Sequence, residues 1–227
     1  MLGKWGLMNL PYVNIHAHRE SLEGEIVPVS LGLHPWNIDF ENYPSQIYFV
    51  FREVKEILGG FKDSLLEYPL NKWYPMIGEC GFDKLKTLTW ELQEEVFLSQ
   101  VTFAQNHQLP VVVHCVRAWE NLWAVYDKVQ PTKPWIIHGF QSSKETLKEV
   151  YRRNMYVSFG TQIMDTQSKA ARALQSLSQD CVFFLETDDT DIPITDVYAA
   201  AAELRNISLE ELKQIQWDKA FQLLQRK

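Results

Sequence analysis

The stretch Val111-Val112-Val113-His114 is a run of β-branched residues that ends in a histidine, and it decides the predicted fold. In the preceding segment, residues 89–108, apolar residues recur at helical spacing, and Pro110 stands where that helix must already have ended. Because the run is apolar on both faces, it is typical of a strand in a parallel sheet that helices cover on each side.

The same alternation of short apolar runs and helical patterns continues along the chain. We expect strands at residues 12–16, 27–33, 76–80, 111–115, 135–138, 156–159 and 182–186. We expect helices at residues 44–58, 89–108, 118–128, 143–153, 166–177, 194–204 and 208–224, the last with Ser208 and Glu211 as a capping box. This order predicts βαβ units and a parallel sheet, either an open doubly wound sheet or a closed barrel.

The ends of the strands favour the barrel. A dinucleotide-binding open sheet would carry G-x-G-x-x-G after its first strand, and the sequence has no such stretch. Potential metal ligands instead follow nearly every predicted strand, which is where TIM-like barrels assemble their sites. No repeat or low-complexity tract divides the chain. We therefore expect residues 1–227 to form one α/β domain, a TIM-like (β/α) barrel.

The N-terminal third is too short for a complete barrel of eight βα units. Only seven residues separate His18 from Ile26, fewer than the roughly 10–12 that a crossover connection needs. We therefore expect a barrel shortened to about seven strands by loss of its second βα unit.

Composition excludes several classes of protein. The 227 residues are 46% hydrophobic with a formal charge of −7, so the chain is neither disordered nor suited to gripping a nucleic acid by diffuse positive charge. No apolar run approaches the roughly 18 residues that span a bilayer. The first ten residues lack the pattern of a secretory signal. The three cysteines show no short spacing and sit in apolar stretches, so we expect small buried side chains in a cytoplasmic protein.

Six polar residues at strand ends predict a metal site. His16 and His18 project to the same side of the first strand because side chains alternate along it, and imidazole is a common ligand of divalent metals. The other four also close apolar runs: Glu79, His114, His138 and Asp188. Buried polar groups without partners are costly, so their convergence on one barrel mouth is best explained by bound metal.

The order of these motifs resembles a known family. The chain carries H-x-H at 16–18, G-E-x-G at 78–81, a strand ending in His114 with an arginine close behind, I-I-H-G-F at 136–140 and L-E-T-D at 185–188. This order is similar to that of the TatD-related metal-dependent hydrolases of the amidohydrolase superfamily, from residue 12 nearly to the end. The resemblance implies a TIM-like barrel and phosphodiester cleavage, as in a deoxyribonuclease.

The resemblance also assigns roles. It implies that His16, His18 and Asp188 hold a first divalent ion, that Glu79 bridges two ions, and that His114 and His138 hold the second. Two such ions, whether Zn, Mg, Mn or Ni, activate a water and stabilise both oxygens of a displacement. Asp188 is then the candidate general base, and Glu79 and Asp188 are the candidate catalytic residues.

Three further residues are candidate substrate contacts. His34 matches a family position near the substrate, and its alternative role is a structural hydrogen bond. Arg19 and Arg117 follow strand-end motifs directly and could form bidentate bonds to a phosphate. Against the family pattern, Asn14 stands where aspartate is usual, and Asp189 and Asp191 add negative charge after Asp188.

Three functional hypotheses follow. The first is a two-metal phosphodiesterase; the overall negative charge disfavours a long duplex, so its substrate is a DNA strand end or a small phosphoester. The second keeps the metals but hydrolyses a small ester or amide, since one fold serves many substrates. The third is a metal-binding protein without turnover, motivated by Asn14 and the shortened barrel. We expect no membrane association and infer no obligate protein partner.

Overall fold

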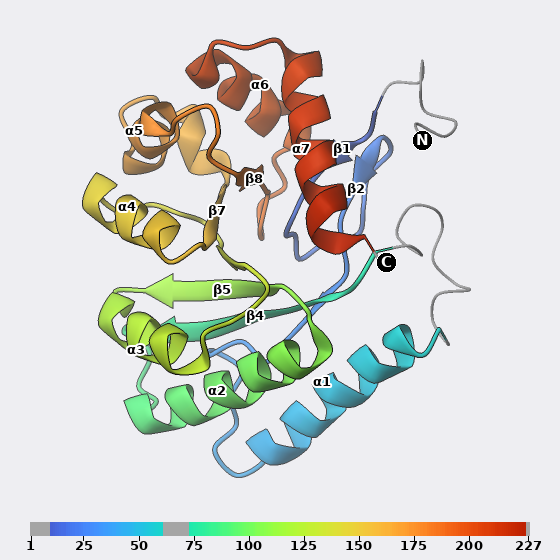
Figure 1. Ribbon diagram of the computed structural model, residues 1–227, viewed down its shortest axis with the longest axis vertical. Coiled ribbons are helices and arrows are strands. Elements are labelled where there is room, and N and C mark those ends of the chain that lie inside the picture. Colours follow the sequence, from blue (N-terminus) through green and yellow to red (C-terminus); the bar gives the residue numbers. More distant parts are fainter. Residues whose placement is uncertain (1–9, 61–72, 226–227) are drawn as a thin grey trace. The chain divides into compact units, whose positions relative to one another are not determined.

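In the part of the chain that the computed structural model describes, residues 10–60 and 73–225, parallel strands alternate with helices from residue 30 to residue 205 (Figure 1). The chain groups into two compact units. One contains Pro28–His138 with the chain's last residues, and the other contains the N-terminal segment up to Val27 with Gly139–Leu223. The segment in which no secretory signal was found lies, except for its tenth residue, outside the described residues.

The unit around Pro28–His138 is a parallel sheet with helices. Its strands are β3 (Ser30–Leu31), β4 (Met76–Asp83), β5 (Val111–Val116) and β6 (Trp135–Ile137), paired in that order and all parallel. Its helices are α1 (Tyr43–Leu58), α2 (Trp90–His107) and α3 (Trp119–Val129). These three helices lie along one side of β4 and β5 (Figure 1). Every residue of β4 is buried, as expected for a central strand.

The second unit contains two parallel strand pairs and the remaining helices. β1 (Tyr12–Val13) pairs with β2 (Glu25–Ile26), and β7 (Tyr156–Phe159) pairs with β8 (Phe183–Leu185). The N–H of Ile15 donates to the carbonyl of Leu185 at 2.9 Å, which joins the end of the first strand to β8. The helical elements are α4 (Lys144–Arg152), the 3-10 helix η3 (Thr161–Met164), α5 (Lys169–Ser176), α6 (Ile194–Arg205) and α7 (Leu209–Leu224).

Side-chain caps start four of the helices. The hydroxyls of Thr89, Ser143, Ser168 and Ser208 each accept a backbone N–H three residues further on, at the start of α2, α4, α5 and α7. These oxygens satisfy N–H groups that have no partner within the helix. The predicted cap at Ser208 is confirmed, and the seven predicted helices all form.

The N-terminal third differs from the prediction in one respect. The strand expected at residues 27–33 is two shorter strands, β2 and β3, which pair with β1 and β4 respectively. Pro28 lies between them, and proline lacks the N–H that a continuous ladder would need. No helix lies between β1 and β3, all of which is described. The predicted absence of a helix after the first strand is therefore confirmed, but because residues 27–33 are divided, the described residues contain eight strands where about seven were predicted.

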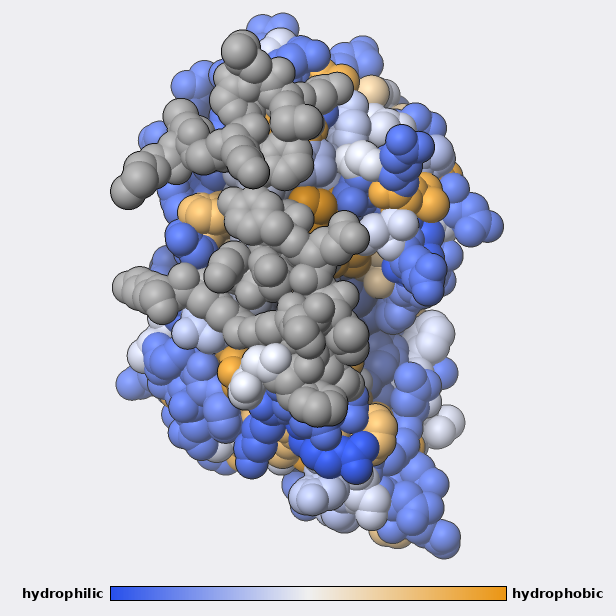
Figure 2. Space-filling view, turned by 90° about the vertical axis from the view of Figure 1, so that its right-hand side faces the viewer, coloured by the Kyte–Doolittle hydropathy of each residue, from blue (hydrophilic) through white to orange (hydrophobic). Residues whose placement is uncertain are grey.

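The described surface gives no sign of a membrane span. In the described residues, no helix combines the length and apolar character needed to cross a bilayer. Hydrophilic residues dominate the described surface in the view of Figure 2. The three cysteines are unbridged; Cys80 is buried as predicted, whereas Cys115 and Cys181 are half-buried.

A buried polar network fixes the first strand. The side-chain amide of Asn14 donates to Glu25 Oε1 at 2.6 Å and to Thr187 Oγ1 at 2.8 Å, and its oxygen accepts the N–H of Thr187 at 3.0 Å. Arg19 places both terminal guanidinium nitrogens on the Glu25 carboxylate, at 2.7 and 3.0 Å. The network ties the end of β1 to β2 and to the segment after β8.

Glu25 is ionised at the centre of this network. Burial favours the neutral carboxyl, but hydrogen bonds from Arg19, from the N–H of Leu22 and from Asn14 outweigh it, so the pKa of Glu25 is below its ordinary value. A buried carboxylate held by several donors stabilises the fold only while it is charged.

We predict that Glu25→Gln lowers the free energy of unfolding by about 2 kcal/mol at neutral pH, because charge-assisted bonds in a buried setting are lost. The difference from wild type should be complete above the ordinary pKa of 4.5. It should shrink as the pH falls through the lower pKa of the folded state. Urea unfolding at a series of pH values measures it, with Glu23→Gln, an exposed neighbour, as control. A pH-independent difference would contradict this account.

Candidate metal centre

The ends of β4, β5 and β6 bring three of the predicted ligands together. Glu79 lies in β4, His114 in β5, and His138 directly after β6. Between Ile77 and Cys80 the register of β4 against β5 shifts by a bulge, a feature that re-aims side chains near active sites. Gly81 pairs with His114 at a φ of 148°, and a Cβ there would overlap the carbonyl of His114. Only glycine allows the two strands this close approach.

These three residues, which we call the Glu79 cluster, converge on one carboxylate oxygen. Glu79 Oε1 lies 2.6 Å from His114 Nδ1 and 2.6 Å from His138 Nε2. The same two ring nitrogens are 3.2 Å apart. Glu79 and His114 are buried. Two imidazoles and a carboxylate that point their ligand atoms at one another form the kind of donor set that holds a divalent ion.

His34 belongs beside this cluster. Its Nε2 lies 3.1 Å from Glu79 Oε1, and its ring meets that of His114 at a centroid distance of 4.5 Å. His34, Glu79 and His114 each offer a ligand atom within 4.8 Å of the others. The residue predicted as a substrate contact therefore borders the candidate metal ligands.

Asp83 contacts the His114 ring at Nε2, the nitrogen that does not face Glu79, and it was not among the predicted site residues. Asp83 Oδ2 lies 3.1 Å from His114 Nε2 and accepts the indole N–H of Trp36 at 2.6 Å. Burial alone would raise the pKa of Asp83, but hydrogen bonds from Trp36, the N–H of Leu85 and His114 hold it below its ordinary value. An ionised carboxylate only accepts hydrogen bonds, so His114 donates from Nε2.

That contact sets the orientation of the His114 ring. With Nε2 against Asp83, Nδ1 faces Glu79 and His138. Carboxylates commonly orient metal-binding histidines in this way. The sequence did contain a signal: Asp83 lies an even number of residues after Glu79 in the same strand, which places both side chains on one side of it.

The other unit contains the Asp188 cluster, formed by His16, His18 and Asp188. Asp188 Oδ1 lies 3.7 Å from His16 Nε2 and 3.4 Å from His18 Nε2. The N–H of His18 donates to the carbonyl of Asp188, and the N–H of Asp188 donates to the carbonyl of His16. These backbone bonds hold the aspartate beside both histidines, with Asp188 at a φ of 54°.

One separation in each cluster matches a pair of ligands on a single metal ion, whereas the 2.6 Å from Glu79 Oε1 to each of its two ring nitrogens is a hydrogen-bond length. Two atoms each about 2.0–2.1 Å from a tetrahedral zinc are roughly 3.3 Å apart. The separations of 3.2 Å between His114 and His138, and of 3.4 Å between His18 and Asp188, are close to that value. In each cluster the donor types are imidazole nitrogen and carboxylate oxygen, which suit zinc, manganese or nickel.

The two predicted arginines have different surroundings. Arg117 is exposed directly after β5, at a φ of 54°. The guanidinium of Arg19 is bonded to the Glu25 carboxylate and to the carbonyl of Glu20. Arg117 therefore presents its charge to solvent, whereas Arg19 has a structural partner.

Comparison with known proteins places the chain in a family. A family model described as TatD related DNase matches residues 11–225. An uncharacterized metal-dependent hydrolase of Haemophilus influenzae is 26% identical over 155 residues, which cover 62% of this chain and 59% of that protein. TatD of Citrobacter rodentium, named a 3'-5' ssDNA/RNA exonuclease, is 29% identical over 133 residues, which cover 57% of this chain and 51% of that protein. The chain thus spans little more than half the length of these curated relatives.

Solved structures agree on the fold. A TatD homologue from Escherichia coli superposes with a TM-score of 0.69 at 20% identity, covering 87% of this chain and 76% of that one. A TatD family hydrolase from Entamoeba histolytica gives 0.66 at 14% identity, covering 88% and 75%. The predicted α/β, TIM-like architecture is confirmed. Because the family model matches the chain almost from end to end, the chain belongs to the TatD related DNase family.

Proposed function

We propose that this protein is a divalent-metal-dependent hydrolase that cleaves phosphodiester bonds at the end of a single DNA strand or in a small phosphoester. Family membership and the names of the relatives support this proposal. The observation that carries it is the Glu79 cluster, in which ligand atoms from three strand ends converge and Asp83 orients one of the histidines.

The proposed ligands are the residues of the two clusters. Glu79, His114 and His138 would hold one ion, and His16, His18 and Asp188 would hold another. The bridging of two ions by Glu79 stays a prediction from the resemblance. When bound, such ions lower the pKa of a water and stabilise charge on phosphate oxygens.

The remaining chemistry belongs to side chains of this protein. The side chain of Asp188 is 35% exposed, so its carboxylate is open to water and is the proposed acceptor of the water's proton. Arg117 is the proposed phosphate contact because it is exposed beside the end of β5. Arg19 is a weaker candidate since Glu25 already binds its guanidinium.

One observation favours a second candidate, a metal-dependent esterase or amidase acting on a small molecule. Asp189 and Asp191 are exposed directly after Asp188. Their charge repels a polyanion but not a neutral ester or amide. The same metal ligands serve this chemistry.

We predict that the metal-loaded protein releases nucleotides from the end of a labelled single-stranded oligonucleotide, and that EDTA stops the release. Glu79→Gln should lower the rate at least ~100-fold, because it removes a charged ligand. Glu120→Gln, an exposed change on α3, is the matched control and should act like wild type. Hydrolysis of chromogenic esters or amides alone would reject the nuclease and support the second candidate.

We predict that His138→Ala binds one divalent ion fewer than wild type. Metal content after dialysis against chelator-free buffer, measured by elemental analysis, gives the stoichiometry without an activity assay. His107→Ala, a histidine at the end of α2, should leave the stoichiometry unchanged. Full metal content and full activity in His138→Ala would reject the assignment of His138 as a ligand.

We predict that Asp83→Asn weakens metal binding by about 10- to 100-fold, the usual cost of losing a carboxylate behind a ligating histidine. Competition with a chromogenic chelator measures the affinity, and circular dichroism of the metal-free variant checks its fold. Asp180→Asn, an exposed change, is the control. Wild-type metal affinity in folded Asp83→Asn would contradict the role given to Asp83.

A further inference from the structure

We propose that Trp36 and Lys86 form a nucleotide-binding subsite beside the Glu79 cluster, where the indole stacks on a base of the substrate strand and the ammonium pairs with a phosphate. The proposal rests on the proposed function, cleavage at the end of a single DNA strand, and names the residues that would receive a base and a phosphate of that strand.

Trp36 is an exposed aromatic residue at the border of the cluster. It is 59% exposed, although tryptophan is usually largely buried. Its ring meets the ring of His34 edge to face at 5.4 Å and that of His114 at 6.3 Å. A ligand on the indole would therefore lie next to His34 and to His114, a candidate metal ligand.

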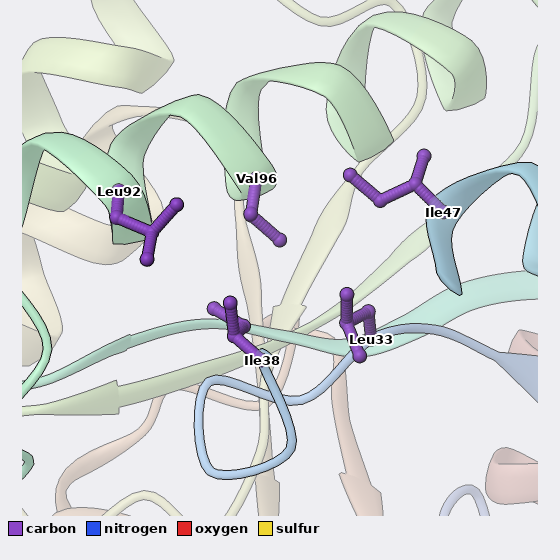
Figure 3. Packing of buried hydrophobic residues seen from close by; sticks show 5 residues of the cluster. All are labelled: Leu33, Ile38, Ile47, Leu92 and Val96. Atoms are coloured by element: carbon purple, nitrogen blue, oxygen red, sulfur yellow. The ribbon is translucent and has the colours of Figure 1, made fainter. Parts of the chain in front are cut away.

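The loop that carries Trp36 is anchored on both sides. Leu33 and Ile38 are buried against Ile47 of α1 and against Leu92 and Val96 of α2, as Figure 3 shows. The side chain of Gln100 holds the backbone of Leu33 by accepting its N–H at 2.7 Å and donating to its carbonyl at 3.1 Å. The exposure of Trp36 thus belongs to a fixed segment.

The indole itself is held in one orientation. Its Nε1–H donates to buried Asp83 at 2.6 Å, and the backbone N–H of Trp36 donates to His34 Nδ1 at 3.0 Å. The polar edge of the ring is therefore bound within the protein, although the residue as a whole is 59% exposed. A platform that is already ordered loses little conformational entropy when a ligand binds.

Lys86 adds positive charge to this platform. Its Nζ lies 4.0 Å from the centroid of the Trp36 ring, a cation–π contact. The side chain is exposed, so a planar ring can replace the ammonium on the indole. The displaced cation then stays within reach of a phosphate carried by the same ligand.

Stacking on an aromatic ring with a cation alongside is how single-stranded nucleic acid is bound without sequence preference. A duplex hides the faces of its bases within the stack, so this subsite selects unpaired bases. The combination also gives the chain, with its formal charge of −7, a local attraction for a phosphate.

The test is binding of a fluorescein-labelled oligothymidylate of about ten nucleotides, a length typical of single-strand sites. Metal-free protein in EDTA excludes turnover, and a strand of equal length without bases serves as the second probe. Wild type should bind the base-bearing strand more tightly. Trp36→Ala should weaken that binding about tenfold, the usual value of one stacked base, without affecting the baseless strand.

Three variants separate the roles. Trp36→Phe keeps a ring but loses the bond to Asp83, and should stay within about threefold of wild type. Lys86→Ala should weaken binding of both strands, because both carry phosphates. Tyr48→Ala removes another exposed aromatic residue, on α1 and 70% exposed, and should change the binding of neither strand.

Equal binding of the two strands by wild type, or equal losses in Trp36→Phe and Trp36→Ala, would overturn the subsite. No binding by wild type would overturn it as well. Base-dependent binding without release of nucleotides by the metal-loaded protein would instead reject the nuclease and leave the subsite standing. Release of nucleotides by the metal-loaded protein, together with equal binding of the two strands, would support the nuclease and reject the subsite.

Discussion

The candidate metal centre depends on one buried carboxylate. Asp83 is 1% exposed, and it accepts hydrogen bonds from His114, from the indole of Trp36 and from the N–H of Leu85. A buried charge is tolerated only when such donors surround it. The same bonds decide which nitrogen of His114 faces Glu79 and how the indole is presented, so one residue orients both a metal ligand and the proposed substrate platform.

Much of the fold was predictable from the sequence because its signals are local. Helical periodicity, the capping hydroxyl of Ser208 and the short apolar runs act over a few residues, and the helices formed where they were expected. The split of residues 27–33 into β2 and β3 was not foreseen. Strand pairing depends on residues that are distant in the sequence. The break at Pro28 could therefore be recognised only once β2 was seen to pair with β1, and β3 with β4.

The candidate site, like the fold, was predicted only in part from the sequence. Metal-ligand types at strand ends predicted Glu79, His114 and His138, since parallel strands bring such ends to one edge. Asp83 was missed because the strand was predicted to end at residue 80, whereas β4 continues to Asp83, so the even spacing from Glu79 was not interpreted as strand alternation. Asn14 is similar: its substitution for the usual aspartate suggested a lost charge, but the structure places the Glu25 carboxylate 2.6 Å from its amide. The carboxylate of Glu25 in β2 thus supplies a negative charge beside Asn14.

Anomalous diffraction from a crystal loaded with manganese or zinc tests the central claim most directly. The account predicts an ion about 2.0–2.2 Å from His114 Nδ1, from His138 Nε2 and from a Glu79 oxygen, with His114 Nε2 still bonded to Asp83. An ion bound through Nε2 of His114, with the ring turned away from Asp83, would contradict it, as would ions found only at other residues.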